Sequence, residues 1–375
     1  MAHRVLSLAA LTALLLPRDS TELYFEPEAG TVLVRTVELF GSFDLDDAEI
    51  TVMGQTMGPE AMGGDLSKAS AEANLSFEQT DTYGRCERGR ALSLVRRLGI
   101  ATFNGEPLSE DKAREVEFTW DGSLGRHVTG IPAGSENDPE DPEVGKMLKV
   151  LRAQVDPSFL LPTGPVDPGA TWKVELGAQE LIDLLVPGLD LKGLAQLSRE
   201  LLEEEIAKQP ADRDQQIELG RRLFEDLSGQ LIADFRPVEA NVTFAGLEPS
   251  AGGVLARLEF DFDLELSFDP SEVILAAFKE LEETQQLETL AIELNFSAEV
   301  SGSLLWDAAH HHSRELSLSG DYSVDIAGDA AISNEEMGEL AFQGLIAFSG
   351  AMESTHTSAP PPPPTEAEAL VPAGG

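Results

Sequence analysis

The last third of the chain carries long stretches in which apolar and polar residues alternate. Between Ala256 and Phe268 every second residue is apolar, and the residues between them are Arg, Glu, Asp or Ser. Successive side chains of a β-strand point to opposite faces, so this pattern predicts a strand about 40 Å long with one apolar and one acidic face. The same alternation returns over residues 290–306 and 316–326. It predicts a large antiparallel sheet with one dry face and one face toward water.

Other segments add strands at both ends of the chain and helices in the middle. Residues 194–208 and 213–232 have helical composition and spacing, and Asp269-Pro270 is a helix start that predicts a helix over residues 271–284. Residues 46–64 and 134–145 have the composition of loops. Segments rich in β-branched and aromatic residues predict further strands at residues 31–45, 73–77, 116–120, 128–131, 238–244 and 341–348.

Together these elements predict an α+β fold. We expect a large, strongly curved antiparallel sheet, half-barrel or sandwich-like, built by both ends of the chain, with a helical insert at about residues 178–232 packed on its apolar face. The domain would span residues 21–352, and the Pro-rich residues 353–375 would form a disordered tail. An alternative division makes a separate β-domain that ends near residue 150.

The first 20 residues predict a signal or leader segment. A short basic start, MAHR, precedes the apolar run of residues 5–16, which has the length of a signal-peptide core and is too short to cross a bilayer. No Ala-x-Ala cleavage site follows it, and a buried N-terminal helix is the alternative. We expect an extracytoplasmic protein (periplasmic, cell-surface or secreted) and no transmembrane span.

Charge narrows the classes of partner. The formal net charge is −41, from 67 acidic and 26 basic residues, so the field of the protein repels phosphate backbones and excludes nucleic acid as a direct partner. Divalent cations or basic proteins would be attracted, although the acids could equally serve only to keep the surface solvated. Basic residues gather in one patch over residues 85–97, which also contains Cys86, the single cysteine. Neighbouring arginines could lower the pKa of that thiol; the alternative is an ordinary small side chain.

Three segments in order along the chain resemble a family of exported, β-rich bacterial proteins of unknown function. They are residues 118–121 (FTWD), residues 161–172 (LPTGPVDPGATW) and residues 302–307 (GSLLWD). The resemblance covers about residues 110–330. It implies export and an antiparallel β-rich fold, and it assigns no activity and no catalytic residue.

No catalytic motif for metalloprotease, serine hydrolase, phosphate-loop or dinucleotide chemistry is present, so we expect a protein that is not an enzyme. The sharpest candidate for a metal is the triple-histidine turn, where His310 and His312 would share a face of an extended chain beside Asp307. The alternative is a polar, His-rich hairpin loop. Copper at the methionines of residues 53–62 and calcium at the acidic loop 135–143 or at Asp44 and its neighbours are the other metal hypotheses, against solvated loops.

The apolar face of the predicted sheet carries the functional hypothesis. Helices or a second sheet could fill that face and leave an ordinary core. Otherwise the face could hold a hydrophobic ligand, a lipid or an acyl chain, as a non-enzymatic envelope protein would. The alternative function is an acidic surface protein that binds cations or protein partners. The candidate ligand-binding residues are Phe260, Phe262, Leu264, Phe296, Trp306 and Tyr322.

Overall fold

The computed structural model describes most of the chain between residues 20 and 361. The described ranges are residues 20–58, 70–87, 89–108, 114–135, 141–197, 235–250, 253–279, 286–334 and 338–361, with Glu200 and a few positions between 223 and 230. The expected leader, most of the expected helices at 194–208 and 213–232, and most of the Pro-rich segment lie outside these ranges.

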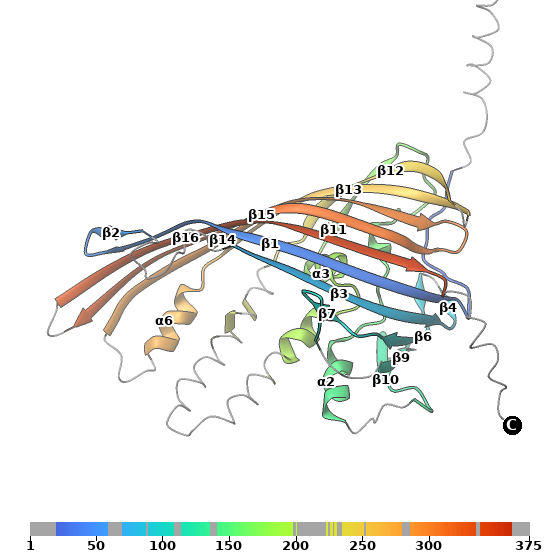
Figure 1. The fold of residues 1–375 in the computed structure, drawn as a ribbon, viewed down its shortest axis with the longest axis horizontal. Helices are drawn as coiled ribbons and strands as arrows, with labels where there is room; N and C mark the ends of the chain where they lie inside the picture. The colour runs from blue at the N-terminus through green and yellow to red at the C-terminus, as the bar shows by residue number, and fades with distance from the viewer. Residues whose placement is uncertain are drawn as a thin grey trace, which may run out of the picture.

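One antiparallel sheet of 14 strands dominates the molecule (Figure 1). Its main order is β10-β9-β6-β3-β1-β16-β15-β14-β13-β12-β11, and β2, β7 and β8 attach at its side. Both ends of the described chain contribute strands, as predicted, and the pairing of β1 with β16 brings them together in the middle of the sheet. The strands are β1 (Val32–Val52), β2 (Gln55–Met57), β3 (Ser70–Tyr83), β6 (Ser93–Leu98), β7 (Thr102–Phe103), β8 (Glu106–Pro107), β9 (Arg114–Asp121), β10 (Arg126–Gly130), β11 (Thr171–Leu176), β12 (Val238–Ser250), β13 (Gly253–Phe268), β14 (Gln286–Asp307), β15 (His312–Asn334) and β16 (Gly338–Ala359). A separate two-stranded ribbon joins β4 (Cys86–Glu87) to β5 (Arg90–Ala91).

The register keeps the apolar residues of neighbouring strands on one face. Phe260 of β13 pairs with Gly302 of β14, which pairs with Leu318 of β15. The Phe260 ring occupies the space over Gly302, since a Cβ built there would lie 2.4 Å from the ring. The predicted alternation is confirmed, and the long strands carry it across the sheet.

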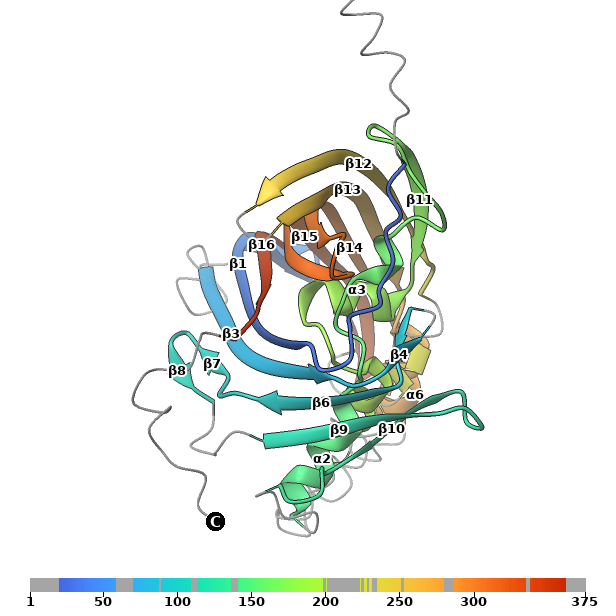
Figure 2. The same ribbon diagram turned by 90° about the vertical axis from the view of Figure 1, so that its right-hand side faces the viewer.

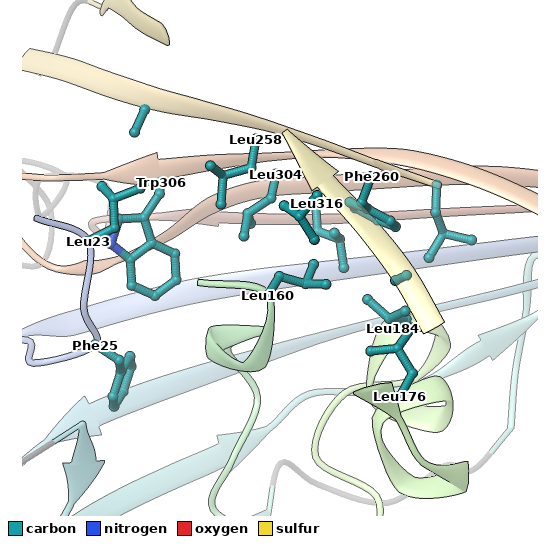
Figure 3. Packing of buried hydrophobic residues seen from close by; sticks show 14 of the residues in the cluster. Leu23, Phe25, Leu160, Leu176, Leu184, Leu258, Phe260, Leu304, Trp306 and Leu316 are labelled. Carbon is teal, nitrogen blue, oxygen red and sulfur yellow. The ribbon is translucent and has the colours of Figure 1, made fainter. Parts of the chain in front are cut away.

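The filled core lies at the end of the sheet where β14 ends and β15 begins (Figure 3). Leu258, Leu304 and Trp306 contribute from the strands, and all three are completely buried. Two segments cover them: the stretch that contains Leu23 and Phe25, and the irregular chain around Leu160. These packed side chains hold the end of the sheet in place.

Helices form a minor part of the described chain. They include α2 (Pro142–Val150), the 3-10 turn η3 (Ser158–Leu160), α3 (Ala178–Leu185) and α6 (Ser271–Lys279), and residues 191–197 are helical as well. Figure 2 shows α3 between β11–β13 on one side and β3, β6 and β9 on the other, and Leu184 of α3 belongs to the core. None of the helices in the part of the chain that the structure describes combines the length and apolar character needed to cross a membrane.

Several boundaries differ from the sequence expectation, and three of them fall in the expected loops and the expected tail. β1 runs on through the expected loop to Val52, α2 begins inside the other expected loop, and β16 continues to Ala359 instead of ending before residue 353. The extension of β16 is explained by hydrogen bonds, because Ser354 and Ser358 are buried and donate to the carbonyl oxygens of Leu185 and Ser313. Partners distant in sequence make these polar residues part of the sheet.

Candidate functional site

The six side chains expected to bind a ligand share the apolar face of the sheet, and they fall into two groups. Trp306, Phe260 and Phe262 are 0%, 3% and 6% exposed and belong to the filled core. The remaining three, Leu264, Phe296 and Tyr322, are half-buried and pack against that core from one side. The first group therefore has little surface to offer a ligand, whereas the second group does.

Burial falls steadily along the apolar face in the direction away from Trp306. After Phe262, β13 continues with half-buried apolar residues up to Phe268, while the residues between them remain exposed. On β14 the half-buried row includes Phe296, whose ring stacks on Tyr322 with centroids 6.0 Å apart. We call this part of the face the half-buried row: Leu264, Leu266, Phe268, Leu290, Ile292, Leu294, Phe296, Tyr322, Val324, Ile326, Ile346 and Phe348.

Two described features adjoin the half-buried row. The helix α6 packs on β14, where the Ile292 N–H donates to the Ser271 hydroxyl at 2.7 Å. A cavity of about 890 Å³ lies between β13 and the residues that precede β12 in the chain, and its apolar lining residues are Phe235, Leu266 and Phe296. Its other lining residues are polar: Arg236, Glu265, Ser267, Asn295, Ser297, Ser323 and Asp325. Six of these seven residues are polar-face positions of β13, β14 and β15, so the cavity opens mainly on the side of the sheet opposite the half-buried row.

The triple-histidine turn is a tightly bonded hairpin. The Asp307 carboxylate accepts the N–H groups of Ala309 and His310 at 3.1 and 3.0 Å, and its other oxygen lies 3.0 Å from Nδ1 of His310. Although burial opposes the change, these hydrogen bonds from His310 lower the pKa of Asp307. The structure thus brings Asp307 together with His310.

His312 takes part in a different environment. Its ring is buried, its Nδ1 lies 2.8 Å from the Ser313 carbonyl oxygen, and burial lowers its pKa. Its centroid is 6.4 Å from that of His310. In the part of the chain that the structure describes, no group of three or more His, Cys, Asp or Glu side chains is arranged to hold a metal ion.

The other sequence candidates lie apart from one another. Met53 is exposed at the turn between β1 and β2, and Asp44 is exposed on β1. Burial raises the pKa of the Cys86 thiol to about 11, so the thiol stays protonated at neutral pH and the idea of an activated cysteine is wrong. Most of the acidic loop 135–143 lies outside the described residues.

Sequence reasoning missed a buried ionic cluster at the edge of the filled core. It contains two cations, Arg35 and Arg96, and two carboxylates, Asp81 and Asp156. Arg35 bonds Asp81 at 3.1 Å and Asp156 at 2.7 Å, and Arg96 bonds Asp81 at 2.7 Å. The charges sum to zero, so the cluster avoids the cost of an unpaired charge away from water.

Hydroxyl and backbone groups complete this cluster. Tyr83 accepts from Arg35 at 2.8 Å and donates to Asp156 at 3.2 Å, while the Ser313 N–H donates to Asp156 at 2.9 Å. Burial opposes ionisation of Asp156, but Arg35 and Ser313 hold its pKa below the usual range. The cavity that Arg35 and Ser313 line measures about 10 Å³, too small for a ligand. The cluster therefore joins β1, β3, β6 and β15 to the segment before η3, and its role is structural.

The only sequence signal for this cluster was polar residues inside apolar strands. Arg35 interrupts the run TVLVRTVELF, and Arg96 lies inside the basic patch. Nothing in the local pattern tells that Asp156, 121 residues away, is the partner of Arg35.

Comparison with known proteins adds no family. No protein-family model matches the chain, and no curated protein matches it. Among solved structures, the secretin InvG of the Salmonella SPI-1 type III secretion injectisome is 9% identical, with a TM-score of 0.16 over 99% of this chain and 74% of that chain. The secretin domain of InvG is 10% identical, with a TM-score of 0.17 over 90% and 65%. TM-scores this low do not establish a shared fold, so the resemblance to exported β-rich proteins stays a prediction.

Proposed function

We propose that the protein holds a hydrophobic ligand, a lipid or an acyl chain, on the half-buried row. One observation carries the proposal: the apolar alternation of β13 to β16 continues well beyond the filled core, while burial of the apolar side chains drops along the same strands. Fully burying a large apolar side chain contributes about 1.5–3 kcal/mol, so a ligand that covers several of these residues gains substantial binding free energy.

The proposal includes two features of the fold, the curvature of the sheet and the position of the helical insert. A strong curvature of the sheet would make the apolar face concave, and a helical insert packed on that face would cover the ligand from the opposite side. Tyr322 fits this arrangement, because its hydroxyl donates to the Ser42 carbonyl oxygen at 2.9 Å and leaves only the apolar ring for the ligand. A satisfied hydroxyl adds no unpaired polar group to an apolar site.

Native mass spectrometry of the purified protein tests the proposal, because a bound lipid adds its mass to the protein. The strands offer a matched pair of variants, since Phe296 pairs with Val324 on the apolar face and Ser297 pairs with Ser323 on the polar face. We expect Phe296→Glu and Val324→Glu to abolish lipid retention, because each places a carboxylate against the ligand. Ser297→Glu and Ser323→Glu should leave it unchanged.

Circular dichroism and tryptophan emission must match the unmodified protein in all four variants. Where Phe296→Glu fails to fold, the milder Phe296→Gln replaces it. If repeated preparations carry no lipid and a neutral hydrophobic dye such as Nile red does not bind, the proposal is refuted. Equal retention by apolar-face and polar-face variants would refute it as well.

A second candidate function uses the polar face of the same strands. Asp263, Glu299 and Asp321 stand side by side across β13, β14 and β15, and a groove of about 400 Å³ runs past them. Like charges directly opposite each other destabilise a sheet, so bound cations or a basic protein would relieve the repulsion. This candidate would be supported if about 5 mM CaCl₂ raised the unfolding temperature more than NaCl of equal ionic strength does.

We also propose an extracytoplasmic location, on the strength of the apolar run at residues 5–16. Cell fractionation of the full chain and of a chain that lacks residues 1–20 tests it. We expect only the full chain to leave the cytoplasm.

A further inference from the structure

A basic cleft lies at the β9–β10 edge of the sheet, away from the strands that carry the half-buried row. Its walls are the hairpin of β9 and β10, the helix α2, residues 151–154 and the helical turn at residues 190–196, and its volume is about 840 Å³. Among the described residues, the cations that line it are Arg90, Arg126, Lys149, Arg152 and Lys192, and the single acidic lining residue is Asp190. In a chain with a net charge of −41, such a surplus of positive charge in one cleft requires an explanation.

Two of the five cations lie against acidic side chains. Arg152 forms an ion pair with Asp183 at 3.1 Å, and Lys149 forms one with Glu200 at 2.7 Å. The carboxylate of Asp190 accepts the backbone N–H groups of Lys192 and Gly193 at 3.0 and 3.3 Å. These contacts build the wall of the cleft.

The other three cations, Arg90, Arg126 and Lys192, are exposed. Within the described ranges, no acidic side chain lies within ion-pair distance of any of them. Toward the described part of the chain, they can therefore bind an anion without first giving up an acidic partner.

An aromatic platform fixes Arg90 at the cleft. The Arg90 guanidinium lies 3.8 Å from the centroid of the Trp120 ring, and His127 packs on the same ring edge-on with centroids 5.2 Å apart. The His127 Nε2 lies 2.7 Å from the Ala91 carbonyl oxygen, and burial lowers the pKa of His127, so this imidazole is neutral at pH 7. Stacking of this kind holds a guanidinium in one plane and leaves its edge free for two parallel hydrogen bonds to a carboxylate or phosphate.

Apolar side chains line the rest of the cleft. Leu148 and Leu151 come from α2 and the residue after it, Val128 comes from β10, and Phe118 and Trp120 come from β9. A ligand that satisfied only the cations would leave this apolar surface in water. A small anion with an apolar body would use both.

We propose that this cleft binds a small organic anion, a phosphate or carboxylate group on an aromatic or short acyl body. Arg90, Arg126 and Lys192 supply the positive charge for the anionic group, and Trp120, Leu148 and Leu151 contact the body. This site shares no residue with the half-buried row, so it stands independently of the proposed lipid function.

Isothermal titration calorimetry of the full chain tests the proposal with two aromatic anions, phenyl phosphate and phenylacetate. Phenol and inorganic phosphate serve as controls, because they represent the aromatic body and the anionic group of phenyl phosphate separately. We expect one saturable site for both aromatic anions, weaker binding of inorganic phosphate, and no binding of phenol. Raising NaCl from 50 to 300 mM (about sixfold) should weaken the affinity, because the salt screens the attraction.

Variants identify the residues. Arg90→Gln and Arg126→Gln should each lower the affinity for phenyl phosphate about tenfold, because each removes hydrogen bonds to a charged group. Arg90→Lys keeps the charge but loses the planar edge, and we expect it to fall between Arg90→Gln and the unmodified protein. Lys173 is an exposed cation that pairs with Glu239 on another part of the sheet. Lys173→Gln is therefore the matched control, and it should leave the affinity for phenyl phosphate unchanged.

No saturable binding of either aromatic anion would overturn the proposal. Affinities unchanged in Arg90→Gln and Arg126→Gln would overturn it too, as would equal binding of phenol. Both arginines are exposed, so the variants are expected to fold, and identical circular dichroism spectra confirm this.

Discussion

The buried ionic cluster offers the sharpest test of how this sheet is held together. Asp156→Asn removes one of the two negative charges and leaves Arg35 and Arg96 facing Asp81 alone. Asp156 is 1% exposed, so water cannot replace the lost charge. Breaking a buried ion pair by removing one partner costs about 3–5 kcal/mol. Domains of ordinary stability unfold with about 5–15 kcal/mol, so the loss should be large.

A double-mutant cycle separates the pair from its surroundings. Arg35→Met alone leaves the two carboxylates with only Arg96, and we expect a similar loss. The double variant restores a neutral cluster of Arg96 and Asp81, so its cost should fall below the sum of the single costs by about 2–3 kcal/mol. The exposed pair of Lys173 and Glu239 is the control, because surface ion pairs contribute about 0–1 kcal/mol.

Guanidinium chloride unfolding at pH 7, followed by circular dichroism and tryptophan fluorescence, gives the free energies of unfolding. The reasoning would be refuted if Asp156→Asn cost less than about 1 kcal/mol, the range of an exposed pair. Strict additivity of the two single variants would refute it too, because then the charges do not interact.

Three further predictions concern groups beside the core. Burial lowers the pKa of His356 to about 4, and its Nε2 lies 3.2 Å from the Leu185 carbonyl oxygen. The contribution of neutral His356 to stability is therefore lost as the pH falls from about 6.5 to 4. His356→Gln should remove up to about 3 kcal/mol of that acid sensitivity, measured as the free energy of unfolding against pH. Burial raises the pKa of Asp183 to about 7, so the free energy of unfolding falls as the pH rises from about 4 to 7. Asp183→Asn should reduce that fall by up to about 4 kcal/mol, measured as the free energy of unfolding against pH. Gly302→Val should destabilise the protein by about 1–3 kcal/mol, because the Phe260 ring fills the space that a side chain needs. Gly41→Val on β1 is the matched comparison, since nothing lies within 4 Å of a Cβ at that position and its φ is not positive. A Gly302→Val protein as stable as the original would contradict the packing of Phe260 over Gly302.

The sequence could predict the strands with long alternation, because side-chain direction in a strand is a local property. Residues 256–268, 290–306 and 316–326 read as strands with one apolar face, and β13, β14 and β15 contain them. The strands β9 and β10 were predicted from their β-branched and aromatic residues, and the start of helix α6 from the cap at Asp269-Pro270. Boundaries were less predictable, since the ends of β1 and β16 depend on what lies beside them.

The sequence by itself determined that an antiparallel sheet with one apolar and one polar face would form. Only the tertiary structure decided which part of the apolar face is filled, since Leu160 and Leu184 reach it from segments with no strand pattern of their own. The same holds for Arg35 and Asp156, which meet across 121 residues, and for Arg90 and Trp120, which meet in the basic cleft. Alternation depends on neighbours two residues apart, whereas burial and charge pairing depend on contacts between segments that chain folding alone brings together.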